Sequence, residues 1–268
     1  MRKTFFGLFF SILLALGAKA QNLEVGLFAG GSYYLGDINP DIHFAQMHPG
    51  VGALARLNLN NRWAVRLNGY YGEVSGDDTK RKYVEGRNLK FNSAILDISA
   101  TAEFNFLEYF TGAYMDYFTP YIFGGIGIIT YNPKANGENL RDLGTEGQLV
   151  GFNGRSKYGN LSMTIPFGFG FKYSISKKLC LGFEWGMRKT FTDYIDDVSK
   201  TYYLDGTKIN PGNPEQALSD PTLNHQPQMQ RGNSEFNDWV NFTGLTLTYK
   251  IELVDQSGCP RGYRKNKR

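Results

Sequence analysis

The sequence predicts an all-β fold, an eight-stranded antiparallel up-and-down transmembrane β-barrel with long outer loops and short periplasmic turns. Three observations lead to it. Strand-like runs that alternate apolar and polar residues recur along the whole chain, and short and long connections alternate between them. Nowhere after the N-terminal segment do about 18 apolar residues follow one another, as a membrane-spanning helix requires. Outer-membrane barrels show this weak, short-range alternation instead.

The first 20 residues are expected to be a signal peptide for secretion. Two basic residues, an apolar run over residues 5–16 and small residues at positions 18 and 20 follow one another, and the apolar part is too short to span a membrane. Residues 21–253 then form one outer-membrane barrel without an internal linker. Residues 254–268 form a basic C-terminal tail in the periplasm.

Eight runs have the period and composition of strands. They span residues 23–35, 50–59, 63–73, 93–106, 119–131, 161–173, 179–191 and 239–253. The clearest is LSMTIPFGFGFKY, residues 161–173, in which large apolar residues alternate with small or polar ones. In the last run Val240 and Phe242 fall out of phase, so a β-bulge is expected near Thr243 and Gly244.

The connections come in two sizes. Residues 60–62 and 174–178 and the aromatic segment 107–118 are short; the long polar connections are 36–49, 74–92, 132–160 and 192–238. Short turns at one rim and long loops at the other are typical of an outer-membrane barrel, with the turns in the periplasm. An even number of strands leaves both ends of the barrel on that side.

Opposite charges share the polar faces of these runs. The residues concerned are Arg56, Arg66, Asp97, Glu103, Lys172, Glu184 and Arg188. An eight-stranded barrel is only just wide enough for its own side chains, so a lumenal charge network is expected, with the large apolar face against lipid. Aromatic residues near strand ends are expected in girdles at the membrane interfaces: Tyr33, Tyr34, Tyr70, Tyr71, Tyr131 and Trp239. The alternative is a soluble barrel with an apolar lumen.

The sequence predicts no catalytic, metal or cofactor site, no nucleic-acid partner and no small-molecule substrate. The three histidines, His43, His48 and His225, lie in or beside the long connections, and their spacing to Ser32 matches no defensible nucleophile and base. The acids of TDYIDD and of LGDINP lack the spacing of a calcium loop.

The C-terminal tail is basic and carries a cysteine. Its charged residues include no acid after Cys259; they are Arg261, Arg264, Lys265, Lys267 and Arg268. One interpretation is a docking arm for an acidic or thiol-bearing periplasmic partner, and the other is a disordered solubilising tail. Cys259 could form a disulfide with Cys180 or stay free for an intermolecular one; spacing does not choose between them.

Several stretches resemble, in order and spacing, the PorG-like outer-membrane β-barrel family of Bacteroidota. They are GGSYYLGDIN (30–39), FNSAILDISATAEFNF (91–106), FTPYIFGGIGIITYNPKA (118–135), LGTEGQ (143–148), SMTIPFGFGFKY (162–173), GFEWGMRKTFTDYIDDVSKTYY (182–203) and DWVNFTGLTLTYKI (238–251). The resemblance implies a non-enzymatic eight-stranded barrel that anchors or positions periplasmic components of the type IX secretion system.

On that resemblance, the partners are outer-membrane lipid and the periplasmic ring made of a PorK-like lipoprotein and a PorN-like protein. The basic tail with Cys259 and the aromatic turn 107–118 are the parts expected to meet the ring, with Cys259 available for an intermolecular disulfide. The alternative function is that of a small porin or ligand-binding outer-membrane barrel without a secretion role, in which the lumenal charges serve passage.

Overall fold

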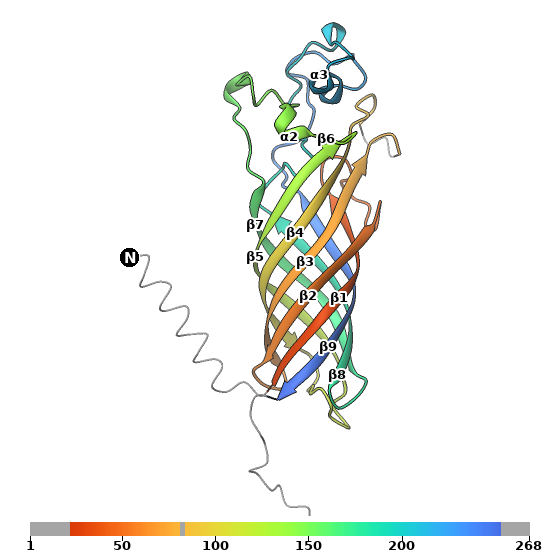
Figure 1. The fold of residues 1–268 in the computed structure, drawn as a ribbon, viewed down its shortest axis with the longest axis vertical. Helices are drawn as coiled ribbons and strands as arrows, with labels where there is room; N and C mark the ends of the chain where they lie inside the picture. The colour runs from red at the N-terminus through yellow and green to blue at the C-terminus, as the bar shows by residue number, and fades with distance from the viewer. Residues whose placement is uncertain (1–21, 81–83, 253–268) are drawn as a thin grey trace, which may run out of the picture.

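Residues 22–80 and 84–252 are described by the structure, a computed structural model. Eight long strands close into one barrel, and the loops at one end carry short helices and a two-residue strand (Figure 1). The strands are β1 (Asn22–Leu35), β2 (His48–Asn58), β3 (Trp63–Asp77), β4 (Lys90–Asn105), β5 (Phe118–Ala135), β6 (Glu138–Asn139), β7 (Leu161–Ser174), β8 (Leu179–Thr190) and β9 (Trp239–Glu252). The helices are α2 (Leu140–Leu143) and α3 (Pro214–Ser219), with 3₁₀ turns at Phe152–Gly154 and Gly206–Lys208.

The barrel is closed and antiparallel. Each long strand pairs with its neighbours along the chain, β1 pairs with β9, and the pairing of β4 with β5 completes the circle, while β6 adds only to the end of β5. The predicted eight-stranded antiparallel barrel is therefore confirmed. The predicted runs match the strands within a few residues, except that β3 and β5 extend further toward the long loops, to Asp77 and Ala135.

The short turns lie at one end of the barrel, together with the start of β1 and the end of β9 (Figure 1). Local side-chain hydrogen bonds form two of these turns. The Asn60 carboxamide oxygen accepts the backbone N–H groups of Arg62 and Trp63 at 2.8 and 2.9 Å. The Ser176 hydroxyl likewise accepts the N–H groups of Lys178 and Leu179. Asn and Ser favour such turns because their short side chains reach backbone two or three residues on.

The two faces of each strand differ in kind. Outward side chains are large and apolar, and Leu27, Ile126 and Met163 keep 68, 65 and 60% of their surface exposed. Inward side chains such as Arg66 and Glu184 are completely buried. Among the described residues, no helix is long and apolar enough to cross a membrane. An apolar exterior around a buried polar interior is the arrangement of a barrel whose solvent is lipid.

The predicted bulge in the last strand is wrong. The register of β9 with β1 runs without interruption from Trp239 opposite Leu35 to Glu252 opposite Asn22, and β8 pairs with it equally regularly. Val240 and Phe242 are simply lumenal residues, both fully buried. The alternation of β9 is unbroken, but its lumenal residues change from polar ones, such as Thr246 and Thr248, to the apolar Val240 and Phe242 toward the long loops.

The loop of residues 36–47, between β1 and β2, covers the outer wall near the long-loop end. Tyr33 points outward from β1 yet is fully buried, because His43 and Phe44 of this loop pack on it with ring centroids 5.8 and 5.1 Å away. The Tyr33 hydroxyl lies 2.9 Å from His43 Nδ1 and accepts a hydrogen bond from Trp185 Nε1. Near the long-loop end, the outer surface of the barrel is therefore formed partly by the strands and partly by this loop.

The aromatic-girdle prediction is wrong for most of its residues. Tyr34, Tyr70 and Tyr131 face the lumen and are 0, 0 and 3% exposed, and Tyr33 lies beneath the loop of residues 36–47. Tyr71 does face outward, with 56% of its surface exposed. The failures have two causes: the period of two places Tyr34, Tyr70 and Tyr131 on the lumenal face, and Tyr33, although it points outward, is covered by a loop. Proximity to a strand end therefore does not mark the membrane interface.

The half of the lumen nearest the long loops is apolar, which the sequence did not predict. A cluster of buried side chains from the strands continues into the loops above them. It comprises Phe28, Tyr34, Ile38, Tyr70, Val74, Leu89, Phe91, Ile95, Ile129, Tyr131, Ala135, Leu140, Ile195, Val198, Val240 and Phe242. Loop residues thus close the barrel mouth with a small hydrophobic core, and we call the loops with this core the cap.

Gly30 marks a close approach of two strands. A Cβ on Gly30 would lie 2.1 Å from the Thr243 carbonyl oxygen, whereas one on Gly69 would meet nothing within 4 Å. We expect Gly30→Ala to destabilise the barrel by about 1–3 kcal/mol, because the backbone must shift to admit the methyl group. Gly69→Ala should leave the temperature of the heat-dependent gel-mobility shift unchanged. Equal shifts for both variants would contradict this assignment.

Candidate functional site

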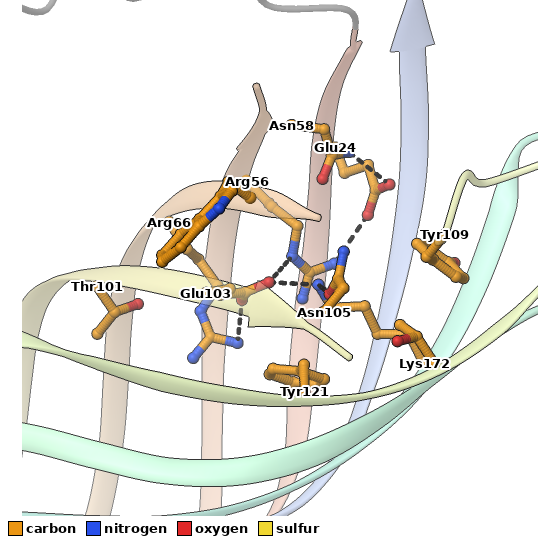
Figure 2. A network of polar contacts seen from close by, with 12 residues as sticks. Glu24, Arg56, Asn58, Arg66, Thr101, Glu103, Asn105, Tyr109, Tyr121 and Lys172 are labelled. Carbon is orange, nitrogen blue, oxygen red and sulfur yellow. Dashed lines mark hydrogen bonds and ion pairs between the residues drawn. The ribbon is translucent and has the colours of Figure 1, made fainter. Parts of the chain in front are cut away.

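Glu103 of β4 is the centre of a buried charge network in the lumen (Figure 2). Its carboxylate lies 2.8 Å from Arg56 Nε and 3.0 Å from Arg66 Nη1, and it also pairs with Lys172 Nζ. The three cations come from β2, β3 and β7, and all four side chains are essentially inaccessible to solvent. One carboxylate therefore links strands on opposite sides of the barrel.

The network continues from these cations to two further carboxylates. Arg56 Nη1 lies 2.8 Å from Glu24 of β1, whose oxygens also accept hydrogen bonds from Asn58, Thr111 and Thr248. Arg66 pairs with Glu184 of β8, and the Tyr121 hydroxyl donates to the same carboxylate at 2.9 Å.

Arg188 and Asp97 form the remaining pair, closer to the cap. The Arg188 guanidinium lies 3.6 Å from Asp97 Oδ1 and is held between the rings of Tyr70 and Phe242, 5.0 and 4.8 Å from their centroids. Cations placed over aromatic faces are stabilised by the ring quadrupole, which is stronger where water is excluded. Arg188 thus joins the charged half of the lumen to its apolar half.

The charges of this lumenal network balance. Four carboxylates, Glu24, Asp97, Glu103 and Glu184, face four cations, Arg56, Arg66, Lys172 and Arg188. Burying an unpaired ion costs several kcal/mol, so each member depends on its partners. All seven lumenal residues predicted from the sequence lie in this network, and Glu24 was missed. The available signal was its phase in the first run, between the apolar residues Leu23 and Val25; the structure places it opposite Arg56.

The short-turn end of the lumen is closed by residues 107–118. Tyr109 enters the lumen and is 3% exposed, and the Thr111 hydroxyl donates to Glu24 at 2.7 Å. Gly112 adopts φ +93°, and a Cβ there would lie 2.4 Å from the Lys177 carbonyl oxygen, so the segment packs tightly against the next turn. This segment is therefore a fixed plug beneath the charge network.

The tip of the same segment projects from the barrel. Tyr114 and Met115 are 93 and 79% exposed, although the residues on both sides are anchored. The Gly112 N–H donates to the Ser174 hydroxyl, and the Ser174 N–H donates to the Tyr117 carbonyl. A pre-organised tip that exposes Tyr and Met has the composition of a protein-binding surface, because both residues are enriched at protein interfaces.

Acidic side chains gather in the cap. Asp196 accepts the Tyr34 hydroxyl, the Asp238 carboxylate accepts the Ile195 N–H at 2.9 Å, and the Asp37 carboxylate accepts the Asn233 N–H at 2.8 Å. Burial raises the pKa of Asp196 and of Asp238 well above the ordinary range, and the neighbouring carboxylates add to the shift. Burial raises the pKa of Asp193 to about 9, with Asp196 as the next cause. Within the described ranges no three such groups are placed to hold a metal ion.

The histidines have structural partners, His225 among them through Asp220 and Tyr202, and the described cysteine is buried. His43 contacts Tyr33, and His48 Nε2 lies 2.7 Å from the Ser75 hydroxyl, while the Ser32 hydroxyl donates to the Glu73 carbonyl. Cys180 is a buried free thiol facing the lumen. The remaining sequence predictions fall on Cys259, Arg261, Arg264, Lys265, Lys267 and Arg268, which lie outside the described residues.

These features define the class: a closed eight-stranded barrel of the outer-membrane type, with an apolar exterior and a filled lumen. The chain belongs to the family described as "Domain of unknown function (DUF6089)", whose model matches residues 2–259. No curated protein matches it.

Solved structures of outer-membrane proteins are similar at low identity. Ail of Yersinia pestis, in complex with the heparin analogue sucrose octasulfate, shares 9% identity over 87% of this chain and 99% of its own, with a TM-score of 0.44. Neisserial surface protein A shares 9% identity over 85 and 97%, with a TM-score of 0.45. OprG of Pseudomonas aeruginosa shares 11% over 87 and 97%, with a TM-score of 0.39.

Glu103→Gln should destabilise the barrel by about 3–5 kcal/mol, since it leaves buried cations without a carboxylate. The matched control is Glu108→Gln, whose carboxylate is 58% exposed and 3.9 Å from Arg62. That change should stay within about 1 kcal/mol, as is usual for surface pairs. The temperature of the gel-mobility shift in detergent measures both, and a Glu103→Gln barrel as heat-resistant as Glu108→Gln would refute the central role of Glu103.

Asp193→Asn should make the cap more stable at neutral pH. An acid whose folded pKa is raised keeps its proton after the unfolded chain has lost it, so stability falls as pH rises from about 4 toward the folded pKa of about 9. The neutral amide removes that loss. We expect slower hydrogen exchange of residues 192–199 at pH 8, corrected for the intrinsic rate, and little change at pH 4.

Asp205→Asn is the matched control for the cap. A hydrogen bond from Thr207 lowers the pKa of Asp205 to about 2, so loss of its charge removes a favourable interaction. At pH 8, Asp205→Asn should leave hydrogen exchange of the residues around it unchanged or make it faster, whereas Asp193→Asn should slow exchange of residues 192–199. Exchange of residues 192–199 that does not respond to Asp193→Asn at either pH would contradict the prediction.

Proposed function

We propose that this protein is a non-catalytic outer-membrane barrel that anchors or positions periplasmic components of a protein secretion machine, as PorG-like barrels of the type IX system do. The observation that carries the proposal is the filled lumen. Between Tyr109 at one end and the hydrophobic core of the cap at the other, charged and aromatic side chains occupy the interior. A barrel so built offers its two ends, rather than a passage, to other molecules.

The short-turn end is assigned to the periplasm, following the usual orientation of outer-membrane barrels. β9 ends at this end of the barrel, where Lys250 lies over the ring of Phe110 in the segment 107–118 (Figure 1). The basic tail with Cys259 follows β9 in the sequence. The partners proposed are a PorK-like lipoprotein and a PorN-like ring protein. Similarity of the motifs to PorG-like barrels supports their identity, and the exposed Tyr114 and Met115 support a docking role for this rim.

Affinity purification of the full chain from its own cells tests the proposal. We expect the wild-type barrel to bring down the lipoprotein and ring protein, and a tail variant to lose them at least about 10-fold, because a few residues dominate most interfaces. The tail variant carries Cys259→Ser with Arg261, Arg264, Lys265, Lys267 and Arg268 changed to Gln. Val150→Ser, at a 67% exposed site in the loop after β6, is the control.

A second variant, Tyr114→Ser with Met115→Ser, reports on the tip separately from the tail. Recovery of both partners at wild-type levels with the tail and tip variants combined would refute docking at this rim. Planar-bilayer recording addresses the alternative function of a small porin: the filled lumen should give no conductance above the lipid background, and stepwise wild-type conductance would favour passage.

A further inference from the structure

A cavity of about 550 Å³ opens on the outer wall of the barrel, just below the cap. Its lining comes from two loops and three strands: Leu35, Gly36, Asp37, Pro40, Met187, Asn233, Phe236, Asn237 and Trp239. The volume is within the range of about 300–1,000 Å³ typical of small-molecule sites. We call it the wall pocket.

The floor of the wall pocket faces away from the lumen. Leu35 of β1 pairs with Trp239 of β9, and Met187 of β8 pairs with the next outward position of β9, Asn241. Their inward neighbours, such as Val240 and Phe242, fill the lumen instead. The pocket floor therefore continues the same exterior surface that carries the lipid-facing residues of these strands.

The wall pocket is recessed beneath its surroundings. Met187 is 5% exposed, whereas Phe183, four residues earlier on the same outward face, is 38% exposed. The loop of residues 36–47 makes the difference, because it covers Tyr33 beside Met187; the Tyr33 hydroxyl lies 4.0 Å from the Met187 sulfur. Met187 contacts Tyr33 and Asn241, and its remaining surface lines the wall pocket.

Polarity in the wall pocket changes along the barrel axis. The strand residues Leu35, Met187 and Trp239, on the side of the membrane belt, are apolar or aromatic. The loop side, further from the belt, carries the polar groups of the lining, the amides of Asn233 and Asn237 and the Asp37 carboxylate, which accepts the Asn233 N–H, together with Pro40 and Phe236. This order, apolar toward the membrane and polar toward the outside, is the order of groups in a membrane lipid.

The mouth of the wall pocket is continuous with the lipid-facing belt and carries a cation. The Trp239 indole packs edge-on against Phe167, which is 39% exposed on the outward face of β7. Lys189, the partner of Trp239 across the β8–β9 ladder, places its ammonium 5.8 Å from the centre of that indole. Phe236 stands at the pocket edge with 70% of its surface exposed.

We propose that the wall pocket binds one acyl chain of an anionic outer-leaflet lipid, with the phosphate of its headgroup beside Lys189. The chain enters from the belt at Phe167, contacts Leu35, Met187 and Trp239, and is covered by Phe236. Exposure of Phe236 at this edge is explained if the side chain lies against the bound lipid. The loop of residues 36–47 then holds a lipid against the wall as well as covering Tyr33.

Native mass spectrometry of the full chain in detergent tests the proposal, with phosphorylated lipid A as the probe. The wild type should retain one lipid per barrel after detergent washing. Phe236→Ser should lower retention at least about 10-fold, the effect expected when a buried aromatic contact is lost. Val150→Ser, which removes an equally exposed apolar side chain from another loop, should retain lipid normally. The gel-mobility shift confirms that each variant is folded.

A second comparison tests the headgroup. Lys189→Gln should weaken retention of phosphorylated lipid A but not of its dephosphorylated form, since only the phosphate needs the ammonium. No retained lipid on the wild type, or equal retention by Phe236→Ser, would overturn the proposal. Equal effects of Lys189→Gln on both lipids would overturn the assignment of Lys189 to the phosphate.

Discussion

Charge balance in a lumen filled with buried side chains is the constraint on which the rest of the barrel depends. Glu103 touches cations from β2, β3 and β7, so its ion pairs form only when strands far apart in the chain have closed into a circle. A buried ion pair adds little stability over well-packed apolar residues, but one missing partner is costly. The network therefore favours the single register in which every charge is matched.

The apolar half of the lumen follows from a different requirement. Toward the long loops the strands rise beyond the membrane belt, and the cap must be held on the barrel mouth. Side chains such as Ile95 and Phe242 meet Ile195 and Val198 of the cap in one cluster, which a charged surface could not bind without desolvation. Arg188 lies where the charged and apolar parts of the lumen meet, because its guanidinium is held between the rings of Tyr70 and Phe242.

Alternation along the runs was enough to predict the strands, their faces and the charged lumenal residues, because a period of two fixes the parity of every side chain. It does not predict how far the polar filling extends, so the phase of Val240 and Phe242 predicts a bulge near Thr243 and Gly244 that the structure does not contain. Tyr109 in the lumen and the acids of the cap were also beyond its reach. Their positions depend on contacts between segments far apart in the chain, such as Asp37 with Asn233.

The covered wall shows why the exterior cannot be understood from lipid contact alone. Asn241 and Thr243 point outward from β9 yet are 0 and 8% exposed, because neighbouring strands and the loop of residues 36–47 enclose them. Bare amide and hydroxyl groups would lack partners in hydrocarbon, and here the Thr243 hydroxyl donates to the Asn241 carboxamide. The loop of residues 36–47 covers these polar groups, and the wall pocket lies at its edge, between the loop and the strands. A lipid chain bound there would fill the recess and continue the apolar outer surface of the barrel.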